Sequence, residues 1–367
     1  MQITAAVVEE VHGPFVVRDV ELDEPGPGEV LVKVAATGFC HTDGIARHGD
    51  LPFPLPGVLG HEGAGTVAAV GSGVTSVREG QAVVIGWPSC GRCRNCLDGE
   101  PRYCLRLGEA IVGGHRLDGP SALRTSSGER LASHFFGQSS FATYALTTET
   151  ALVPVPEELS VELMGPLACG LATGAGAVFH TIRPLPGASL VVYGVGTVGL
   201  AAIMAARNSA ATTIVAVDRH ASRLALASSL GATDIVDAAA SDPVAAVHDI
   251  CGGPADFALE CTGVISVVRQ AIDSVGMRGT CVLIGGAPAG AEFAVDHLST
   301  LWGKTIVGTL GGSGRSARLI GSLMDLHASG RFPFDRLVEF FALDRMEDAV
   351  TASYEGAVIK PVIRMPH

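Results

Sequence analysis

Residues 1 to about 160 alternate short apolar segments with stretches rich in glycine and proline. Short strands with turn residues between them are typical of an all-β domain with long loops. The polar, serine- and glycine-rich residues 119–130 predict one such loop. The predicted strands are residues 5–10, 29–36, 65–70, 81–85 and 140–146.

From about residue 163 to residue 301, apolar strand-like runs alternate with helical runs such as residues 221–230. This alternation predicts an α/β domain built on a doubly wound parallel sheet, with strands at residues 189–193, 213–217, 234–236, 257–260 and 280–284. We therefore divide the chain into residues 1–162, 163–302 and 303–367. The last part adds strands at residues 305–310 and 358–364 and is expected to return to the first domain.

Length and charge narrow the class of protein. A chain of 367 residues, 47% of them hydrophobic, is long enough for two domains with large cores. A net charge of −12 without a basic stretch argues against nucleic acid and anionic membranes as partners. The N-terminus does not resemble a signal peptide, and the longest apolar run, residues 190–206, is interrupted by glycines. We expect a cytoplasmic protein without a membrane span.

The run Gly194-Val195-Gly196-Thr197-Val198-Gly199 joins an apolar strand to a helix that ends near Arg207. In this context Gly194, Gly196 and Gly199 allow a tight turn, a close approach of a pyrophosphate and close packing of helix on strand. The start of the helix then faces the phosphates. The sequence predicts a dinucleotide-binding site that includes Thr197 and Val198.

Asp218 ends the next predicted strand, where a carboxylate binds the two ribose hydroxyls of a dinucleotide. Its charge repels a 2′-phosphate, which favours NAD over NADP. Arg219 and Arg223 follow closely and keep NADP open, because arginines can accommodate that phosphate.

Four cysteines in C-x2-C-x2-C-x7-C spacing predict a structural zinc site: Cys90, Cys93, Cys96 and Cys104. Four thiolates can close around one Zn²⁺ in the saturated tetrahedron of such a site. Disulfides are the first alternative, but the expected cytoplasmic location disfavours them. An iron–sulfur cluster is the second, and the neighbouring motifs favour zinc over it.

Cys40, His61 and Cys169 predict a second zinc site. Two thiolates and an imidazole leave the fourth position open, which is the arrangement of a catalytic zinc. Each residue has an ordinary alternative, because a lone cysteine is often a core thiol and a lone histidine is often structural. Their occurrence together with the four-cysteine motif favours the metal site.

Taken together, these motifs resemble those of the zinc-dependent medium-chain alcohol dehydrogenases over essentially the whole chain. Residues 133–141 are most similar to the bacterial aryl (benzyl) alcohol and geraniol dehydrogenases of that family. The resemblance implies a GroES-like, mostly β catalytic domain around a Rossmann domain, with the active site between them. The motifs that carry it are Gly38-Phe39-Cys40-His41-Thr42-Asp43, Gly60-His61-Glu62, the four cysteines, Cys169-Gly170-Leu171-Ala172-Thr173-Gly174 and the glycine fingerprint.

The same resemblance implies an activity, which is the interconversion of a primary aryl or allylic alcohol and its aldehyde, with hydride transfer to or from NAD. Two Zn²⁺ per chain are implied, one catalytic and one structural. By matching positions, Arg223 contacts the adenosine ribose, His41 and Lys360 contact the pyrophosphate, and Thr173 packs near the nicotinamide.

For the chemistry itself, the resemblance implies that Thr42 accepts the substrate hydroxyl proton and that Asp43 orients the His61 imidazole. Glu62 has two open roles beside the metal, as an electrostatic partner or as a transient replacement for a ligand. The chain departs from the animal-type enzymes at Ile45, where those have a histidine that ends the proton relay. The relay must end elsewhere, through the ribose hydroxyl to water or through His41 or His48.

Trp87, Phe135 and Phe136 match pocket positions of the family and predict an aromatic substrate channel, with ordinary core packing as the alternative. Two other functions stay open, a thiol-adduct (formaldehyde-type) dehydrogenase and a non-catalytic NAD-binding scaffold. A homodimer is expected, with residues 305–310 as a candidate edge strand across a two-fold axis.

Overall fold

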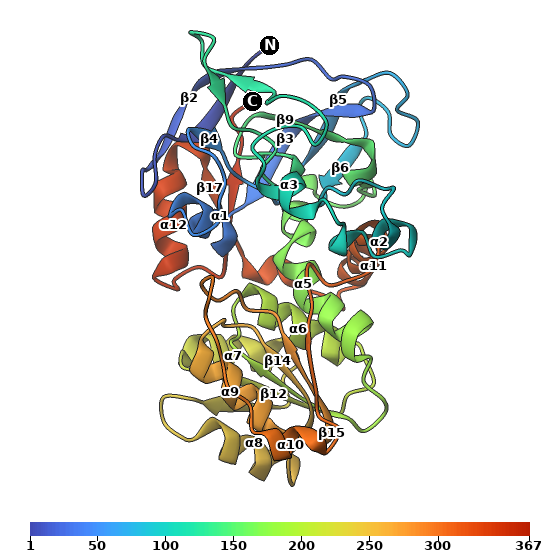
Figure 1. Ribbon diagram of the computed structural model, residues 1–367, viewed down its shortest axis with the longest axis vertical. Coiled ribbons are helices and arrows are strands. Elements are labelled where there is room, and N and C mark those ends of the chain that lie inside the picture. The colour runs from blue at the N-terminus through green and yellow to red at the C-terminus, as the bar shows by residue number, and fades with distance from the viewer. The chain divides into compact units, whose positions relative to one another are not determined.

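A parallel sheet forms the centre of the second half of the chain in the computed structural model, which describes residues 1–367 (Figure 1). Its six strands lie in the order β13-β12-β11-β14-β15-β16, and every neighbouring pair is parallel. The chain starts in the middle of the sheet and moves first to one edge and then to the other, so the predicted doubly wound sheet is confirmed. The strands are β11 (Ser189–Tyr193), β12 (Thr213–Asp218), β13 (Asp234–Asp237), β14 (Ala255–Glu260), β15 (Val275–Leu283) and β16 (Thr305–Gly308).

The helices between these strands follow from the local sequence. Every side chain of 199–206 in α6 is buried, as expected for a helix that is apolar on all sides. Asp242 caps α8 by accepting hydrogen bonds from the backbone N–H groups of Val244 and Ala245. The helices of this part are α5 (Gly170–Gly176), the π-helix η5 (Ala177–Ile182), α6 (Thr197–Arg207), α7 (Ala221–Leu230), α8 (Pro243–Cys251), α9 (Ile265–Ser274) and α10 (His297–Leu301).

The rest of the chain contains two further sheets. One is antiparallel, in the order β4-β1-β2-β7-β8. The other runs β10-β6-β5-β3-β18-β17, with β9 also paired to β3. The strands are β1 (Gln2–Val8), β2 (Phe15–Leu22), β3 (Glu29–Gly38), β4 (Gly57–Val58), β5 (Gly63–Val70), β6 (Ala82–Ile85), β7 (Leu123–Arg124), β8 (Arg130–Leu131), β9 (Tyr144–Thr148), β10 (Leu152–Pro154), β17 (Val338–Ala342) and β18 (Lys360–Arg364).

Helices in this part are short, except for two near the C-terminus. The C-terminal elements, red in Figure 1, join the N-terminal ones because β18 pairs with β3. One apolar core, formed by buried residues such as Val32, Leu59 and Phe141, lies among these strands. The helices are α1 (His41–Arg47), α2 (Arg94–Leu97), η1 (Pro101–Tyr103), α3 (Leu107–Val112), η2 (Phe135–Gly137), η3 (Glu149–Ala151), α4 (Val161–Met164), η4 (Gly165–Ala168), α11 (Ser316–Ala328), η6 (Phe334–Leu337), η7 (Leu343–Arg345) and α12 (Met346–Tyr354).

Two compact units divide the chain. The first comprises Met1–Cys169, Gly314–Ala328 and Phe334–His367, and the second comprises Gly170–Ser313 and Ser329–Pro333. The chain returns to the first unit later than the predicted residue 303, because β16 extends the parallel sheet by pairing with β15. The first boundary likewise follows the predicted residue 162 by a few residues, since α4 and η4 remain with the first unit.

One local prediction needs correction, and one strand was not predicted. Residues 119–130, expected to be a loop, contain β7 and the start of β8, which pair as a short hairpin. Strand β2 was not expected, because exposed valines at positions 16 and 17 break a simple alternation of apolar and polar residues.

No single helix is long and apolar enough to cross a membrane. The consecutive helices Val161–Ala168 and Gly170–Ile182 reach that length and apolarity only together, and all residues of 164–178 are buried in the protein.

Candidate metal centres and nucleotide-binding site

Four side chains from three segments of the first unit meet at one point. Cys40 precedes α1, His61 and Glu62 lie between β4 and β5, and Cys169 follows η4. Their potential ligand atoms all lie within 4.8 Å of one another. The structure therefore brings together the three predicted ligands of the second zinc site, with Glu62 beside them.

The imidazole of His61 is held in one orientation by Asp43. His61 Nδ1 lies 2.9 Å from Asp43 Oδ1, and both side chains are fully buried. The same carboxylate accepts hydrogen bonds from the backbone N–H groups of Gly60, at 3.1 Å, and Cys40, at 2.9 Å. Since the Asp43 carboxylate can only accept hydrogen bonds, the hydrogen between the two side chains belongs to Nδ1 of His61.

His61 Nε2 is then the ring nitrogen that is left to face the site. This atom is buried and has no hydrogen-bond partner in the protein. Since buried polar atoms nearly always have a partner, the Nε2 atom fits a metal ion. The donor set, two sulfurs and one imidazole nitrogen, is one that Zn²⁺ accepts.

Protonation in this cluster reflects how closely its groups are packed. A hydrogen bond from Cys169 holds the pKa of Cys40 well below its usual value, and the same interaction, with burial, raises the pKa of Cys169. Burial lowers the pKa of His61, but the charge and hydrogen bond of Asp43 outweigh it and raise that pKa to about 10. Without a metal, Cys40 is therefore a thiolate, while Cys169 and the Nε2 atom of His61 carry protons that a bound Zn²⁺ would displace.

Glu62 forms a buried ion pair with Lys360. Lys360 Nζ lies 2.9 and 3.1 Å from the two carboxylate oxygens and also donates to the carbonyl of Phe39 at 3.0 Å. Burial raises the pKa of Glu62 to about 7, although the charge of Lys360 lowers it. Lys360 thus faces Glu62 in this structure, and its expected contact with a pyrophosphate stays a prediction.

The groups expected to move protons lie on α1 or directly after it. Thr42 is half-buried, and its Oγ1 is 3.7 Å from Cys40 Sγ. The ring of His41 lies 6.1 Å from that of Tyr354, and the ring of His48 is stacked on Tyr354 at 6.2 Å. The position of Ile45 offers no titratable group, so both histidines remain candidates for the end of the relay.

Two aromatic side chains pack on His61, and a third packs on one of them. Phe136 stacks on the imidazole with ring centres 4.6 Å apart, and Phe135 meets it edge-on at 5.6 Å. Trp87 packs edge-on against Phe136 at 4.7 Å. Phe136 has a φ of 49°, in the left-handed region that bulky residues rarely adopt. The predicted pocket residues are therefore neighbours of the metal cluster, although Phe135 and Phe136 are buried.

Gln138 was not predicted, and it fixes the backbone next to His61. Its side-chain amide donates to the carbonyls of His61, at 3.1 Å, and Ile85, at 3.0 Å, while its oxygen accepts from the N–H of Gly63 at 3.0 Å. The available signal was its place inside residues 133–141, where the resemblance to aryl alcohol dehydrogenases is strongest.

The four cysteines of the first motif also converge, with all sulfurs within 4.8 Å of one another. None of the nine cysteines of the chain forms a disulfide. Backbone N–H groups point at the sulfurs, from Cys90 and Arg106 to Cys104 and from Leu105 to Cys93, at 3.3 to 3.4 Å. We refer to residues 90–104 as the cysteine lobe, and its sulfur set fits one tetrahedral Zn²⁺.

These hydrogen bonds give the thiols of the cysteine lobe different pKa values. Backbone donors at Leu105 and Cys96 lower the pKa of Cys93 to about 6, and those at Arg92 and Cys93 lower the pKa of Cys90. Burial, with the neighbouring sulfurs, raises the pKa of Cys96 to about 12. Thiolate is the ligating form, so part of the cysteine lobe is ready for a metal at neutral pH.

In the second unit the glycine fingerprint forms the turn between β11 and α6. Gly194 has a φ of +84°, and a Cβ there would lie 2.5 Å from Thr262. A Cβ at Gly199 would lie 2.0 Å from the carbonyl oxygen of Gly194, whereas one at Gly196 would meet nothing within 4 Å. Gly194 thus makes the tight turn, Gly196 leaves the surface open and Gly199 allows the close packing. This is the order that a dinucleotide-binding turn requires.

Asp218 closes β12 beside this turn. One carboxylate oxygen accepts the N–H of Val195 and the other the N–H of His220, both at 2.9 Å. A carboxylate has about four acceptor positions, so it can still accept ribose hydroxyls. Arg223 is half-buried on α7, Thr173 is buried on α5, and Thr197 and Val198 open α6.

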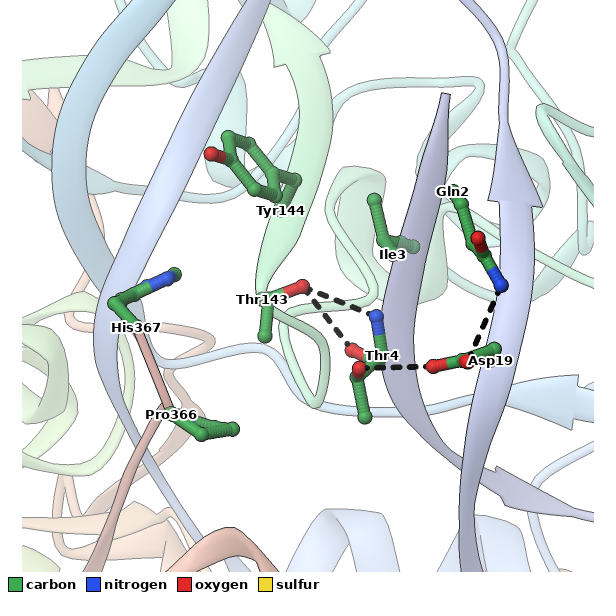
Figure 2. Close-up of a pocket in the computed structure, with 8 residues that line it drawn as sticks. All are labelled: Gln2, Ile3, Thr4, Asp19, Thr143, Tyr144, Pro366 and His367. Atoms are coloured by element: carbon green, nitrogen blue, oxygen red, sulfur yellow. Dashed lines mark hydrogen bonds between the residues drawn. The ribbon is translucent and has the colours of Figure 1, made fainter.

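A surface pocket of about 330 Å³ lies elsewhere in the first unit (Figure 2). Four of its residues are bonded to one another, since Asp19 accepts from Gln2 and Thr4, and Thr4 is bonded to Thr143. It contains none of the predicted site residues and does not compete with the metal cluster as a reaction site. It is lined by Gln2, Ile3, Thr4, Asp19, Thr143, Tyr144, Pro366 and His367.

Comparison with known proteins gives two matching family domains and solved structures of the same fold. The alcohol dehydrogenase GroES-like domain matches residues 26–157, and the zinc-binding dehydrogenase domain matches residues 197–328. The crystal structure of benzyl alcohol dehydrogenase from Acinetobacter calcoaceticus has a TM-score of 0.96 and 41% identity, and the match covers 100% of both chains.

Two curated relatives span almost the whole chain. Geraniol dehydrogenase of Castellaniella defragrans is 41% identical over 365 residues, which cover 98% of this chain and 96% of that protein. S-(hydroxymethyl)glutathione dehydrogenase of Paracoccus denitrificans is 32% identical over 376 residues, covering 99% and 100%. With these domains, this fold and these two cysteine clusters, the chain belongs to the zinc-dependent medium-chain alcohol dehydrogenase family.

Proposed function

We propose that this chain is an NAD-dependent enzyme that interconverts a primary aryl or allylic alcohol and its aldehyde. In this proposal Cys40, His61 and Cys169 hold the catalytic zinc, and the cysteine lobe holds the structural zinc. The observation that carries it is the buried, unpartnered Nε2 of His61, directed at two cysteine sulfurs.

When bound, zinc supplies a redox-inactive Lewis acid for an oxygen, and NAD supplies the hydride acceptor. The chain's own residues then have separate tasks. Asp43 keeps the hydrogen of His61 on Nδ1, so that Nε2 stays available. Thr42 accepts the hydroxyl proton of the alcohol and gives its own proton to the next group of the relay, which is the ribose hydroxyl with water or one of His41 and His48, because Ile45 has no titratable group.

Substrate class follows from the rings around His61. Trp87, Phe135 and Phe136 make the wall next to the ligand imidazole apolar and aromatic. Such a wall favours a flat or unsaturated group on the alcohol, through burial of apolar area and ring contacts of roughly 0.5–1.5 kcal/mol each. The similarity to a benzyl alcohol dehydrogenase and a geraniol dehydrogenase supports the same class.

We therefore expect benzyl, cinnamyl or geranyl alcohol to exceed ethanol in kcat/KM by at least about tenfold, a margin that requires only ~1.4 kcal/mol. NADH formation with a panel of alcohols measures this ratio. Phe136→Leu should reduce the ratio of kcat/KM for benzyl alcohol to that for ethanol. The matched control is Phe141→Leu, because Phe141 is buried in the same segment but packs on Phe15 and Phe39.

Equal efficiency on ethanol and benzyl alcohol would show that these rings do not shape the site. Activity that appears only when a small thiol is added would instead assign the chain to the thiol-adduct dehydrogenases. An enzyme that holds zinc but oxidises no alcohol of the panel would support the non-catalytic scaffold.

We also propose a homodimer formed through the β16 edge of the parallel sheet. An edge strand offers unpaired backbone groups to a second copy. Large apolar side chains are exposed on the segments next to it, with Leu301 66% exposed and Trp302 53% exposed. Nine cysteines without a disulfide suit a reducing compartment, and we place the dimer in the cytoplasm.

Sedimentation should therefore give twice the mass of the chain, and Leu301→Glu should shift the protein towards monomer because a charge would be buried at the interface. Leu185→Glu is the control, since Leu185 is an equally exposed leucine, 74%, of the same unit. A monomeric wild-type protein, or equal effects of both substitutions, would refute this interface.

A further inference from the structure

Arg102 lies between the two clusters of cysteines. It belongs to the short helix η1 inside the cysteine lobe, two residues before Cys104. Unlike the other arginines of the lobe, it is only 1% exposed. An arginine in a loop between zinc-binding cysteines is expected in solvent, so its burial needs a reason.

On one side, Arg102 contacts the segment that carries Cys169. Its Nη2 donates to the carbonyl oxygen of Ala168 at 3.4 Å. Ala168 is the last residue of η4 and directly precedes Cys169. This hydrogen bond joins the cysteine lobe to Ala168, which is 66 residues further along the chain and precedes the proposed metal ligand Cys169.

On the other side, Arg102 is linked to His61 through aromatic rings. Its guanidinium lies over the ring of Trp87, 4.4 Å from the ring centre. Trp87 packs on Phe136, and Phe136 stacks on His61. The side chain of Arg102 therefore touches both the peptide before one proposed ligand and the ring stack behind another.

The burial of this cation is costly. Nε and Nη1 of Arg102 have no hydrogen-bond partner in the protein. An arginine remains charged, and a buried charge without an ion-pair partner carries a large desolvation penalty. The stack on the indole ring of Trp87 offsets part of that penalty. An apolar side chain would fill the same volume at lower cost, so stability of the lobe does not explain this residue.

We propose that Arg102 is a positioning residue that couples the cysteine lobe to the catalytic metal centre, by holding Ala168 and Trp87 so that Cys169 and His61 stay at ligand distance. The inference rests on the proposed assignment of Cys40, His61 and Cys169 as metal ligands. Residues that orient metal ligands typically change metal affinity by 10–100-fold when they are replaced.

The test follows both zinc ions of the holoenzyme during dialysis against a chelator. Arg102→Met should release the catalytic zinc roughly 10–100-fold sooner than the wild type, while the zinc of the cysteine lobe is retained. Cobalt placed in the catalytic site should show an altered thiolate absorption band in this variant. Arg94→Met is the matched control, since Arg94 is an exposed arginine of the same lobe, and it should change neither.

A Cys40→Ser background identifies which zinc is lost. This chain holds only the lobe zinc, and adding Arg102→Met should leave that ion in place. Parallel loss of both zincs, or loss of the lobe zinc from the double variant, would reduce Arg102 to a structural residue of the lobe and overturn the proposal. Unchanged retention of the catalytic zinc would overturn it as well.

If Arg102→Met does not fold, Cys96→Ser tests the same link from the lobe side. Without its metal the lobe cannot hold Arg102, so the catalytic zinc should again leave sooner. Retention equal to that of the wild type would contradict the coupling. Failure of the proposed function would be seen separately: the Cys40→Ser variant would then contain as much zinc as the wild type.

Discussion

Replacing Cys40 by serine is expected to reduce kcat/KM for benzyl alcohol at least about a thousandfold while the protein stays folded. A serine hydroxyl at neutral pH is a poor zinc ligand compared with a thiolate. The variant would therefore lose the catalytic zinc, a Lewis acid that stabilises the transition state by several kcal/mol. The fold should survive, because the backbone N–H of residue 40 can still donate to Asp43. Metal analysis should give about one zinc per chain in place of two.

Cys96→Ser is the matched comparison, because it removes one sulfur from the other cluster. It should also leave about one zinc per chain, but with a lower melting temperature and faster proteolysis of residues 90–104. Metal binding in such a lobe is coupled to its folding, so the effect falls first on stability. Near-normal turnover by the Cys40 variant, or the same loss of stability in both variants, would contradict the assignment of the two clusters.

The parallel sheet could be predicted closely from the sequence. Strand β11 and helix α7 have the predicted bounds, and strands buried on both faces, such as β11, appear in the sequence as continuous apolar runs. The first unit was predicted less well. Two-residue strands such as β7 and β8 give no periodic signal, and they are visible only once their partners are known.

The functional site could likewise be predicted only in part. Cys40 and His61 lie in motifs with local spacing, and Cys90 to Cys104 form a single run, so the sequence predicts both clusters. The pairing of Glu62 with Lys360 joins positions 298 residues apart. The burial of Arg102 depends on how the lobe packs against Trp87. Neither the Glu62–Lys360 pair nor the burial of Arg102 has a local sequence pattern, because only tertiary contacts remove these charges from water.

The cofactor preference is expected to depend on Asp218. In the wild type, catalytic efficiency should be higher with NAD than with NADP, because the carboxylate at the end of β12 repels a 2′-phosphate. Asp218→Gly loses charge-assisted hydrogen bonds to the ribose that contribute about 1.5–3 kcal/mol. The KM for NAD should therefore rise roughly tenfold to a hundredfold. NADP should become a substrate, with Arg219 and Arg223 nearby to bind its phosphate.

Asp218 also accepts hydrogen bonds from Val195 and His220, so the glycine variant changes more than charge. Asp218→Asn separates the effects, since an amide oxygen can still accept one of these bonds while the charge is gone. Asp237→Gly is the positional control, because Asp237 ends the neighbouring parallel strand β13 in register with Asp218. It should leave both KM values unchanged. If the wild type prefers NADP, or if both glycine variants weaken NAD equally, the charge of Asp218 does not select the cofactor.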